Sequence, residues 1–350
     1  MKYIYTIPVM IITLILAHCD GGSKPVTVPE PDNIWERSLS NPVLTGNSTI
    51  TDICDPSVLY TGNKYQLWAS CVTNEDNMAH VCYSESIDGD NWSDPQIVFS
   101  PAIGGWDNIK TEIPTVTYNE NAPTEKRYTM WYGGAASTTP DLTKIGLAYS
   151  AEGTNWTRLS ADESPYSKEG LVIDLNNINV FSDPVVVVKE NTYHMWFNSF
   201  SEVVSNKLEI LHATSTDGIT WKMDSDNPAL TASQLWEYGS HIETDCDDVV
   251  HPTVIWNSDK QQFYMWYGSF DATGNETYTG IGYAVSSNGI EWTKYADNPV
   301  FTANSYLKNE ETGISTGPSV VFADGVYHLY YTGADSSAKR VICHATSNGL

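Results

Sequence analysis

The chain has 350 residues and a formal net charge of −25, because 43 acidic residues outnumber 18 basic ones. Phosphate backbones repel such a chain, so we expect no nucleic-acid partner. Hydrophobic residues make up 41% of the chain, with 12 Trp and 21 Tyr, which is enough for a large core.

The N-terminal segment has the pattern of an export signal. Lys2 precedes an apolar run over residues 4–17, which is short for a membrane span and typical of a signal peptide. The run ends in Leu-Ala-His-Cys19, which resembles a bacterial lipoprotein box with His where a small residue is usual. We therefore expect a signal peptide over residues 1–19 with Cys19 lipidated, then a linker over residues 20–32. The alternative is an ordinary secretory signal; in either case the protein is exported, and it meets a membrane only through a lipid anchor.

Five cysteines follow Cys19. Cys71 and Cys82 fall on consecutive predicted strands, and Cys54 and Cys246 each lie just upstream of a strand that begins a repeat. Either pair could form a disulfide in an exported protein, and buried free thiols are the alternative. None of the spacings is that of a zinc site.

One pattern of short strands occurs five times from about residue 52 onward. Each copy begins with a proline and a β-branched run, and continues with an aromatic strand. Four copies then end in a Ser-x-Asp/Glu/Asn-Gly-x-x-Trp turn that opens a fourth strand, such as residues 292–301. The strand-opening prolines are Pro56, Pro114, Pro184, Pro252 and Pro318. The second-strand tryptophans, which we expect in the core, are Trp68, Trp131, Trp196 and Trp266.

The fifth copy lacks its turn Trp and its fourth strand, and the missing piece stands at the other end of the chain. Residues 35–44 match residues 292–301, so the N-terminal strand is expected to complete the last unit. The prediction is an all-β fold over residues 33–350: a five-bladed β-propeller with four antiparallel strands per blade, closed by the N-terminal strand joining the last blade. We expect a monomer.

The residues beside the strand-opening prolines are predicted to form one ring, because the first strand of each propeller blade lines the central channel. Carboxylates from at least three blades then meet in one pocket. Close carboxylates raise the pKa of at least one of them, which separates a proton donor from an ionised partner, as glycoside hydrolysis requires. The ring contains Asp52, Asp55, Glu112, Asp183, Asp247, Asp248, His251, Ser315 and Thr316.

With these motifs the chain resembles the five-bladed propeller glycosidases, the arabinanase/β-xylosidase family and the invertase/levansucrase-like families, over about residues 33–350. The resemblance implies that Asp55, which precedes a proline in the first blade, is the base or the nucleophile. It implies that Asp183, in the same position of the third blade, orients the acid and binds sugar hydroxyls. The Glu of the family's fourth blade is missing, because Val-His251-Pro stands there. The acid is then Glu112, or a fourth-blade group such as Asp248 or His251, or this chain does not catalyse.

Two aromatic residues and a possible cation complete the predicted site. Trp106 and Trp236 precede the second and fourth blades in similar places and are expected to stack on sugar rings; packing between blades is the alternative. Asp52, Asp248 and Thr316 are expected to bind substrate. No cofactor is expected, although Asp248 and its neighbour Asp247 would suit the Ca²⁺ found on the axis in some relatives.

The function we predict is a glycoside hydrolase acting on an oligo- or polysaccharide, with an inverting mechanism. Asp55 would activate water, Asp183 would orient, and Glu112 or a fourth-blade group would donate the proton. A non-catalytic glycan-binding lipoprotein of the same fold is the first alternative. A phosphorylase is the second, but it requires a basic phosphate pocket, and Lys110 is the only basic residue near the ring in the sequence.

Overall fold

The computed structural model describes residues 35–136, 143–175, 183–200, 208–238, 249–271, 277–302 and 316–349. Several sequence predictions lie outside the described residues: the signal peptide and linker predicted over residues 1–32, Cys19, Cys246, Asp247, Asp248 and Ser315. No helix among the described residues is long and apolar enough to cross a membrane.

The described residues form strands and two short 3-10 helices, η1 (Thr124–Lys126) and η3 (Leu235–Tyr238), so the all-β prediction is confirmed. The strands fall into five antiparallel units. Unit 1 contains β2 (Ile50–Tyr60), β3 (Tyr65–Thr73), β4 (Ala79–Ser86) and β5 (Gln96–Phe99). Unit 2 contains β6 (Lys110–Tyr118), β7 (Tyr128–Ala135), β8 (Lys144–Ser150), β9 (Thr157–Arg158) and β10 (Leu171–Ile173). Unit 3 contains β11 (Val185–Lys189), β12 (Thr192–Phe200), β13 (Leu208–Ser215) and β14 (Lys222–Met223). Unit 4 contains β15 (Val250–Asn257), β16 (Gln262–Asp271), β17 (Thr277–Ser286) and β18 (Thr293–Lys294). Unit 5 contains β19 (Thr316–Ala323), β20 (Val326–Ala334), β21 (Arg340–Ser347) and β1 (Glu36–Arg37).

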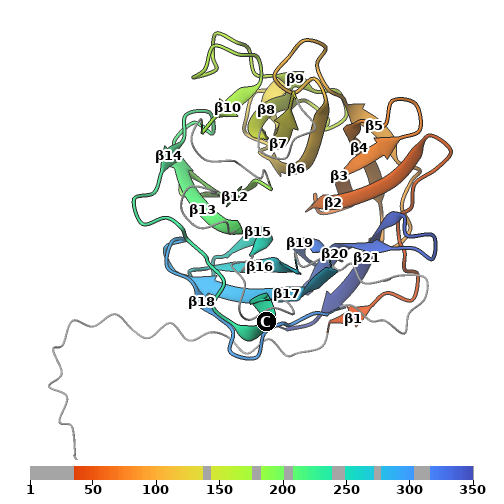
Figure 1. Cartoon of the computed structure of the whole chain (residues 1–350), viewed down its shortest axis with the longest axis vertical. Coiled ribbons are helices and arrows are strands. Elements are labelled where there is room, and N and C mark those ends of the chain that lie inside the picture. Colours follow the sequence, from red (N-terminus) through yellow and green to blue (C-terminus); the bar gives the residue numbers. More distant parts are fainter. Residues whose placement is uncertain are drawn as a thin grey trace, which may run out of the picture.

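The units are arranged around a common centre, with the first strand of each unit innermost (Figure 1). Units 3, 4 and 5 are separate four-stranded sheets, whereas a single parallel pair, Ala79 with Lys110, joins units 1 and 2 into one nine-stranded sheet. No sheet among the described residues closes on itself. The five-blade count and the closure of a propeller therefore stay predictions.

The N-terminal strand pairs with the C-terminal strand, as the sequence predicted. Glu36 of β1 lies opposite Thr346 of β21. Trp35 packs edge-on against Trp266, with ring centroids 6.4 Å apart and an interplanar angle of 75°. The pair formed by Trp68 and Trp156 has nearly the same geometry, 6.3 Å and 78°. Trp35 therefore takes the place of the turn Trp that the fifth copy lacks.

The predicted fourth strands are shorter than expected. Of residues 292–301, only β18 and one bridge at Phe301 pair with β17. Between β18 and this bridge, the side-chain amide of Asn298 makes the hydrogen bonds that a strand backbone would make. Its Oδ1 accepts from the Tyr283 N–H at 2.8 Å, and its Nδ2 donates to the Tyr283 carbonyl at 3.0 Å. The expectation of a continuous strand was wrong because a side chain satisfies the backbone groups that a longer strand would pair.

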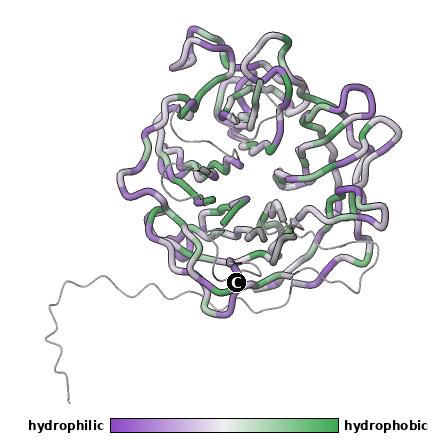
Figure 2. Tube along the Cα trace, in the orientation of Figure 1, coloured by the Kyte–Doolittle hydropathy of each residue, from purple (hydrophilic) through white to green (hydrophobic). Residues whose placement is uncertain are grey.

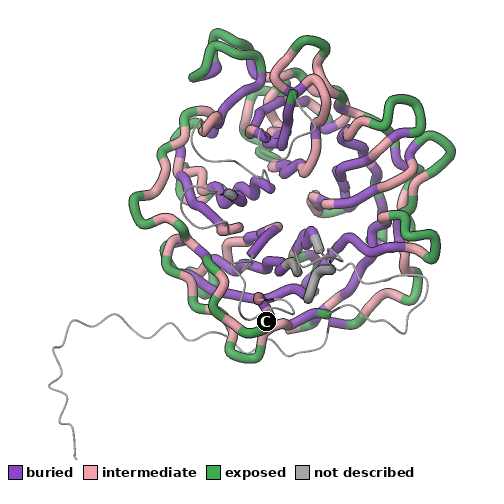
Figure 3. The backbone as a smooth tube through the Cα atoms, viewed as in Figure 1, coloured by how far each residue is buried: buried purple, intermediate pink, exposed green. Residues whose placement is uncertain are grey.

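The core lies between units, where the second-strand aromatics meet the turns of the next unit. Trp68, Trp131 and Trp196 are fully buried, as predicted, and each indole N–H donates to a glycine carbonyl of the following unit. The acceptors are Gly153, Gly218 and Gly289. Hydrophobic residues concentrate along the strands (Figure 2), and exposure increases toward the outer turns (Figure 3). The thiols of Cys54, Cys71 and Cys82 are buried and free.

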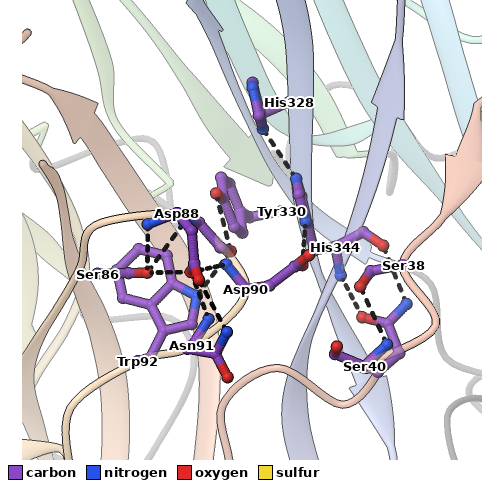
Figure 4. A network of polar contacts seen from close by, with 12 residues as sticks. Ser38, Ser40, Ser86, Asp88, Asp90, Asn91, Trp92, His328, Tyr330 and His344 are labelled. Atoms are coloured by element: carbon purple, nitrogen blue, oxygen red, sulfur yellow. Dashed lines mark hydrogen bonds and ion pairs between the residues drawn. The ribbon is translucent and has the colours of Figure 1, made fainter.

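A chain of polar contacts joins units 5 and 1 (Figure 4). His328 Nδ1 lies 3.0 Å from His344 Nε2, and His344 Nδ1 lies 2.8 Å from Asp90 Oδ1 in the unit 1 turn. At the other end, the Tyr65 hydroxyl lies 3.2 Å from His328 Nε2. In this row of contacts the Tyr65 hydroxyl can donate to His328, His328 to His344, and His344 to Asp90. The row therefore links unit 5 to unit 1 by hydrogen bonds.

Candidate active site

The five strand-opening segments converge on one pocket with an empty volume of about 400 Å³, its open side included. This brings together three of the predicted catalytic residues, Asp55, Asp183 and His251, although they come from three different units. Ile113 and Gly317 occupy the equivalent positions of the other two units. The remaining lining residues are the five prolines and the residues after them, Ser57, Thr115, Val185, Thr253 and Ser319.

The residue before each strand-opening proline adopts a left-handed backbone conformation. The φ angles are 52° for Asp55, 50° for Ile113, 38° for Asp183, 50° for His251 and 58° for Gly317. Such φ values are strained in non-glycine residues, above all in β-branched ones, and persist only where surrounding contacts hold them. In units 1, 2, 4 and 5 the register with the neighbouring strand also shifts here, as at a β-bulge. The same strained backbone position therefore occurs in all five units, and the side chains of Asp55, Asp183 and His251 enter the pocket from it.

Asp183 and His251 form a buried pair. His251 Nδ1 lies 3.2 Å from Asp183 Oδ2, and the two side chains are only 16% and 7% exposed. Burial raises the pKa of Asp183 to about 6, an effect that His251 opposes and that the charges of Asp55 and Glu112 reinforce. The pocket therefore holds a carboxyl group that binds a proton near neutral pH.

Glu112 does not line the pocket, but its charge reaches Asp183. Its carboxylate forms an ion pair with Lys110 Nζ two residues earlier on β6. Both side chains are about one-fifth exposed. The electrostatic coupling places Glu112 in the same charge cluster as Asp55 and Asp183.

Arg340 is a basic residue near the pocket that the sequence did not reveal. Its backbone N–H donates to Asp52 Oδ1 at 3.2 Å, and its Nε lies 3.6 Å from the same oxygen. Cys54, Asp55 and Asp52 together raise the pKa of its guanidinium. Asp52 thus contacts Arg340 and does not line the pocket. Arg340 is 288 residues from Asp52, so no local pattern could have linked them.

Trp106 and Trp236 do not line the pocket. Trp106 stacks on Tyr132 with ring centroids 5.8 Å apart and donates its N–H to the Glu169 carbonyl. Trp236 packs on Tyr267 at 5.7 Å. These contacts are the ones that packing predicts, and stacking on sugar stays a prediction.

The residue after each of these tryptophans is a buried acid. Asp107 accepts hydrogen bonds from the Tyr132 hydroxyl and Arg158 Nε, at 3.0 and 2.9 Å. Glu237 makes the equivalent contacts with Tyr267 and Lys294. The similar placement of the two tryptophans in the sequence therefore reflects a repeated anchor for the segment that precedes units 2 and 4.

The remaining predicted residues are less well described. The backbone of Thr316 begins β19 opposite Thr332. Asp248 and Asp247 lie outside the described residues, so their roles in binding substrate or Ca²⁺ stay predictions. Gly317 matters more than expected, because a Cβ there would lie 2.9 Å from Asp55 Oδ1. The missing side chain makes room for the Asp55 carboxylate.

Solved structures that share this fold at low sequence identity include glycoside hydrolases. One similar structure is a thermostable family-43 glycoside hydrolase, with 19% identity, coverage of 89% of this chain and 91% of that one, and a TM-score of 0.64. Another is a glycosyl hydrolase from Bacteroides ovatus, with 16% identity, coverage of 90% and 93%, and a TM-score of 0.63. A third comes from work on the GH130 family of mannoside phosphorylases, described as containing glycoside hydrolases that target β-1,2 mannosidic linkages in Candida mannan. It has 15% identity, coverage of 93% and 96%, and a TM-score of 0.66. No protein-family model and no curated protein matches the chain.

Proposed function

We propose that this protein is a glycoside hydrolase acting on an oligo- or polysaccharide. The observation that carries the proposal is the pocket that brings Asp55, Asp183 and His251 together from three different units. Glycoside hydrolysis needs a proton donor and a base at one bond, and ionisable side chains that meet in one pocket can supply both. The names of the structures that share this fold support the same class of reaction.

The proposed mechanism is inversion. Asp55 acts as the base that activates water. His251 donates the proton to the departing sugar oxygen, and Asp183 orients the imidazole through its contact with Nδ1. Glu112 is the second candidate for the acid, since its charge reaches Asp183.

We further propose that the five units are the blades of one closed propeller. Hydrogen bonds between neighbouring units support this. Ser57 Oγ of unit 1 accepts from the Val116 N–H of unit 2, Ser319 Oγ of unit 5 from the Val58 N–H of unit 1, and Thr253 Oγ1 of unit 4 from the Val320 N–H of unit 5. The indole bonds of Trp131 and Trp196 link unit 2 to unit 3 and unit 3 to unit 4. Each unit therefore has a polar link to the next, including the last to the first.

A substrate screen tests the proposed activity. The soluble domain is incubated with aryl-glycosides and polysaccharides, with and without inorganic phosphate. Asp55→Asn should lower the rate by about 10²–10⁴-fold, the range for loss of a general base. Asp94→Asn is the matched control, because Asp94 also precedes a proline but is exposed and lies outside the pocket.

The outcomes separate the alternatives. Hydrolysis that survives Asp55→Asn removes Asp55 as the base. Turnover that depends on phosphate indicates a phosphorylase. Binding to a glycan array without turnover favours the non-catalytic alternative.

The cellular proposal is export with a lipid anchor on Cys19, acting as a monomer on a carbohydrate substrate. Cys19→Ala should release the protein from the membrane fraction of cells that express the full chain. Continued membrane retention of this variant would contradict the anchor.

A further inference from the structure

The strained residues of the pocket are held by side chains from neighbouring units. The Asp55 N–H donates to Thr332 Oγ1 at 2.9 Å, and the His251 N–H donates to Asn198 Oδ1 at 2.9 Å. Thr332 and Asn198 occupy the same place in their units, two residues after the second-strand aromatic, and both are buried. In unit 1 the same place holds Ser70, which accepts the Ile113 N–H at 2.7 Å.

These contacts do more than satisfy a donor. A residue with φ near +50° relaxes to negative φ when its surroundings permit, and that rotation swings its Cβ away from its former direction. A hydrogen bond from the N–H of the same residue opposes this rotation about φ, because the rotation axis passes through the backbone nitrogen. Thr332 and Asn198 therefore fix the direction in which the carboxylate of Asp55 and the imidazole of His251 enter the pocket.

The surroundings of Thr332 leave its hydroxyl little freedom. A Cβ on Gly317 would lie 3.2 Å from Thr332 Oγ1 and 2.9 Å from Asp55 Oδ1. The hydroxyl, the carboxylate and the bare Gly317 backbone thus share one confined space. Asn198 is fixed in a similar way, because its Nδ2 donates to the Val249 carbonyl at 2.8 Å and so sets which amide atom faces His251.

We propose that Thr332 is a positioning residue that aims Asp55 through the backbone N–H, and that Asn198 does the same for His251. Neither Thr332 nor Asn198 lines the pocket, so neither touches the substrate in this proposal. The inference rests on the proposed function, because positioning has a catalytic consequence only if Asp55 and His251 act on a substrate.

Steady-state kinetics on the best glycoside from the screen tests Thr332 first. Thr332→Val keeps the shape and removes the acceptor, and it should lower kcat about 10–100-fold while changing KM less than about threefold, since small displacements of a catalytic group have effects of this size. Thr332→Ser should restore kcat to within about threefold of wild type. Ser84→Ala is the control, because it removes another buried hydroxyl, bonded to the Ser93 carbonyl at 2.6 Å, away from the pocket.

A double variant tests whether Thr332 acts through Asp55. In the Asp55→Asn background, Thr332→Val should cause no further loss of kcat, because effects of residues that act as one unit do not add. Unchanged kcat in a folded Thr332→Val protein, a Thr332→Ser rate as low as that of Thr332→Val, or a multiplicative loss in the double variant would each overturn the proposal.

Hydrogen exchange separates this inference from the proposed function. The Asp55 amide should exchange at least about tenfold faster in Thr332→Val or Thr332→Ala than in wild type, since it loses its acceptor, and it should be unchanged in Ser84→Ala. This readout needs no substrate and is measured on whichever variant folds. An unchanged Asp55 amide refutes the positioning contact, whereas a wild-type protein without hydrolase activity refutes the function instead.

Discussion

Replacing Asp183 with Asn should make the protein more stable at neutral pH and less active. Burial disfavours the charged carboxylate of Asp183 and raises its pKa to about 6 in the folded protein, from the ordinary value of 3.8. Folding therefore binds a proton between about pH 4 and pH 6. The stability that depends on this group is fully present below pH 4 and is lost as the pH rises through 6. A difference of about two between the folded and unfolded pKa corresponds to a loss of about 3 kcal/mol.

The assay is urea unfolding of wild type and Asp183→Asn at pH 4 and pH 7.5. The quantity compared is the difference in the free energy of unfolding between the two proteins, measured at each pH. Effects of the substitution that do not depend on pH, such as an altered contact with His251, are the same at both pH values and cancel. We expect the difference in free energy of unfolding to move in favour of Asp183→Asn by about 2.5 kcal/mol between the two pH values, since part of the effect is already lost at pH 4. Asp94→Asn, at an exposed position, should show no such movement. A difference that stays constant with pH, or moves in favour of wild type, would refute the reasoning about burial.

Four further predictions concern the pocket and the junction between units 5 and 1. Gly317→Ala should cost about 1–3 kcal/mol of stability and lower kcat about 10²-fold, because the added Cβ would contact Asp55 Oδ1. The control is Gly325→Ala, at φ +86° with no atom within 4 Å, which should show the backbone strain alone and keep kcat. An equal loss of kcat in both variants would contradict the role of the contact with Asp55. Trp35→Ala should cost about 3–5 kcal/mol in urea unfolding, as should Trp92→Ala at the equivalent position, and a Trp35 effect below about 1 kcal/mol would show that this residue does not complete the last unit. Burial and the neighbouring His344 lower the pKa of His328 to about 4, so the stability that this group contributes is complete above about pH 6.5 and is lost as the pH falls through 4. His328→Phe should therefore lose less stability than wild type between pH 7 and pH 4. Equal losses in the two proteins would contradict the lowered pKa of His328. His251→Asn should lower kcat about 10²–10⁴-fold if His251 is the proton donor, whereas a loss of this size seen only in Glu112→Gln would assign that role to Glu112.

The sequence was informative where the chain repeats itself. The recurring Trp of the second strand and the matching segment at residue 35 predicted the antiparallel units and the pairing of β1 with β21. The three residues Asp55, Asp183 and His251 were predicted to share one pocket because each stands directly before a strand-opening proline. Periodicity could supply this information because equivalent positions in a repeat occupy equivalent places in space.

The rest of the site depends on contacts between residues that no periodicity connects. Thr332 lies 277 residues from the Asp55 that it holds, and Ser, Asn and Thr at its position look like ordinary strand residues. Arg340 likewise reaches Asp52 only after unit 5 has packed on unit 1. The packing of Trp106 on Tyr132 and of Trp236 on Tyr267 could not be predicted either, because these partners are distant in sequence. The positive φ values could not be predicted either, since proline restricts its predecessor without selecting this conformation.

The position of the N-terminal segment has a consequence for the order of folding. Asn41 bonds the backbone of His344, a contact that spans 303 residues. Contacts of such sequence separation form late, because the closure of a long loop precedes any gain from the contact. While the chain is being synthesised, the earlier units can pack one by one, but the segment after Trp35 stays unpaired until the last strand has been made. Loss of either end therefore unravels the same sheet, so the two termini act as a single folding element.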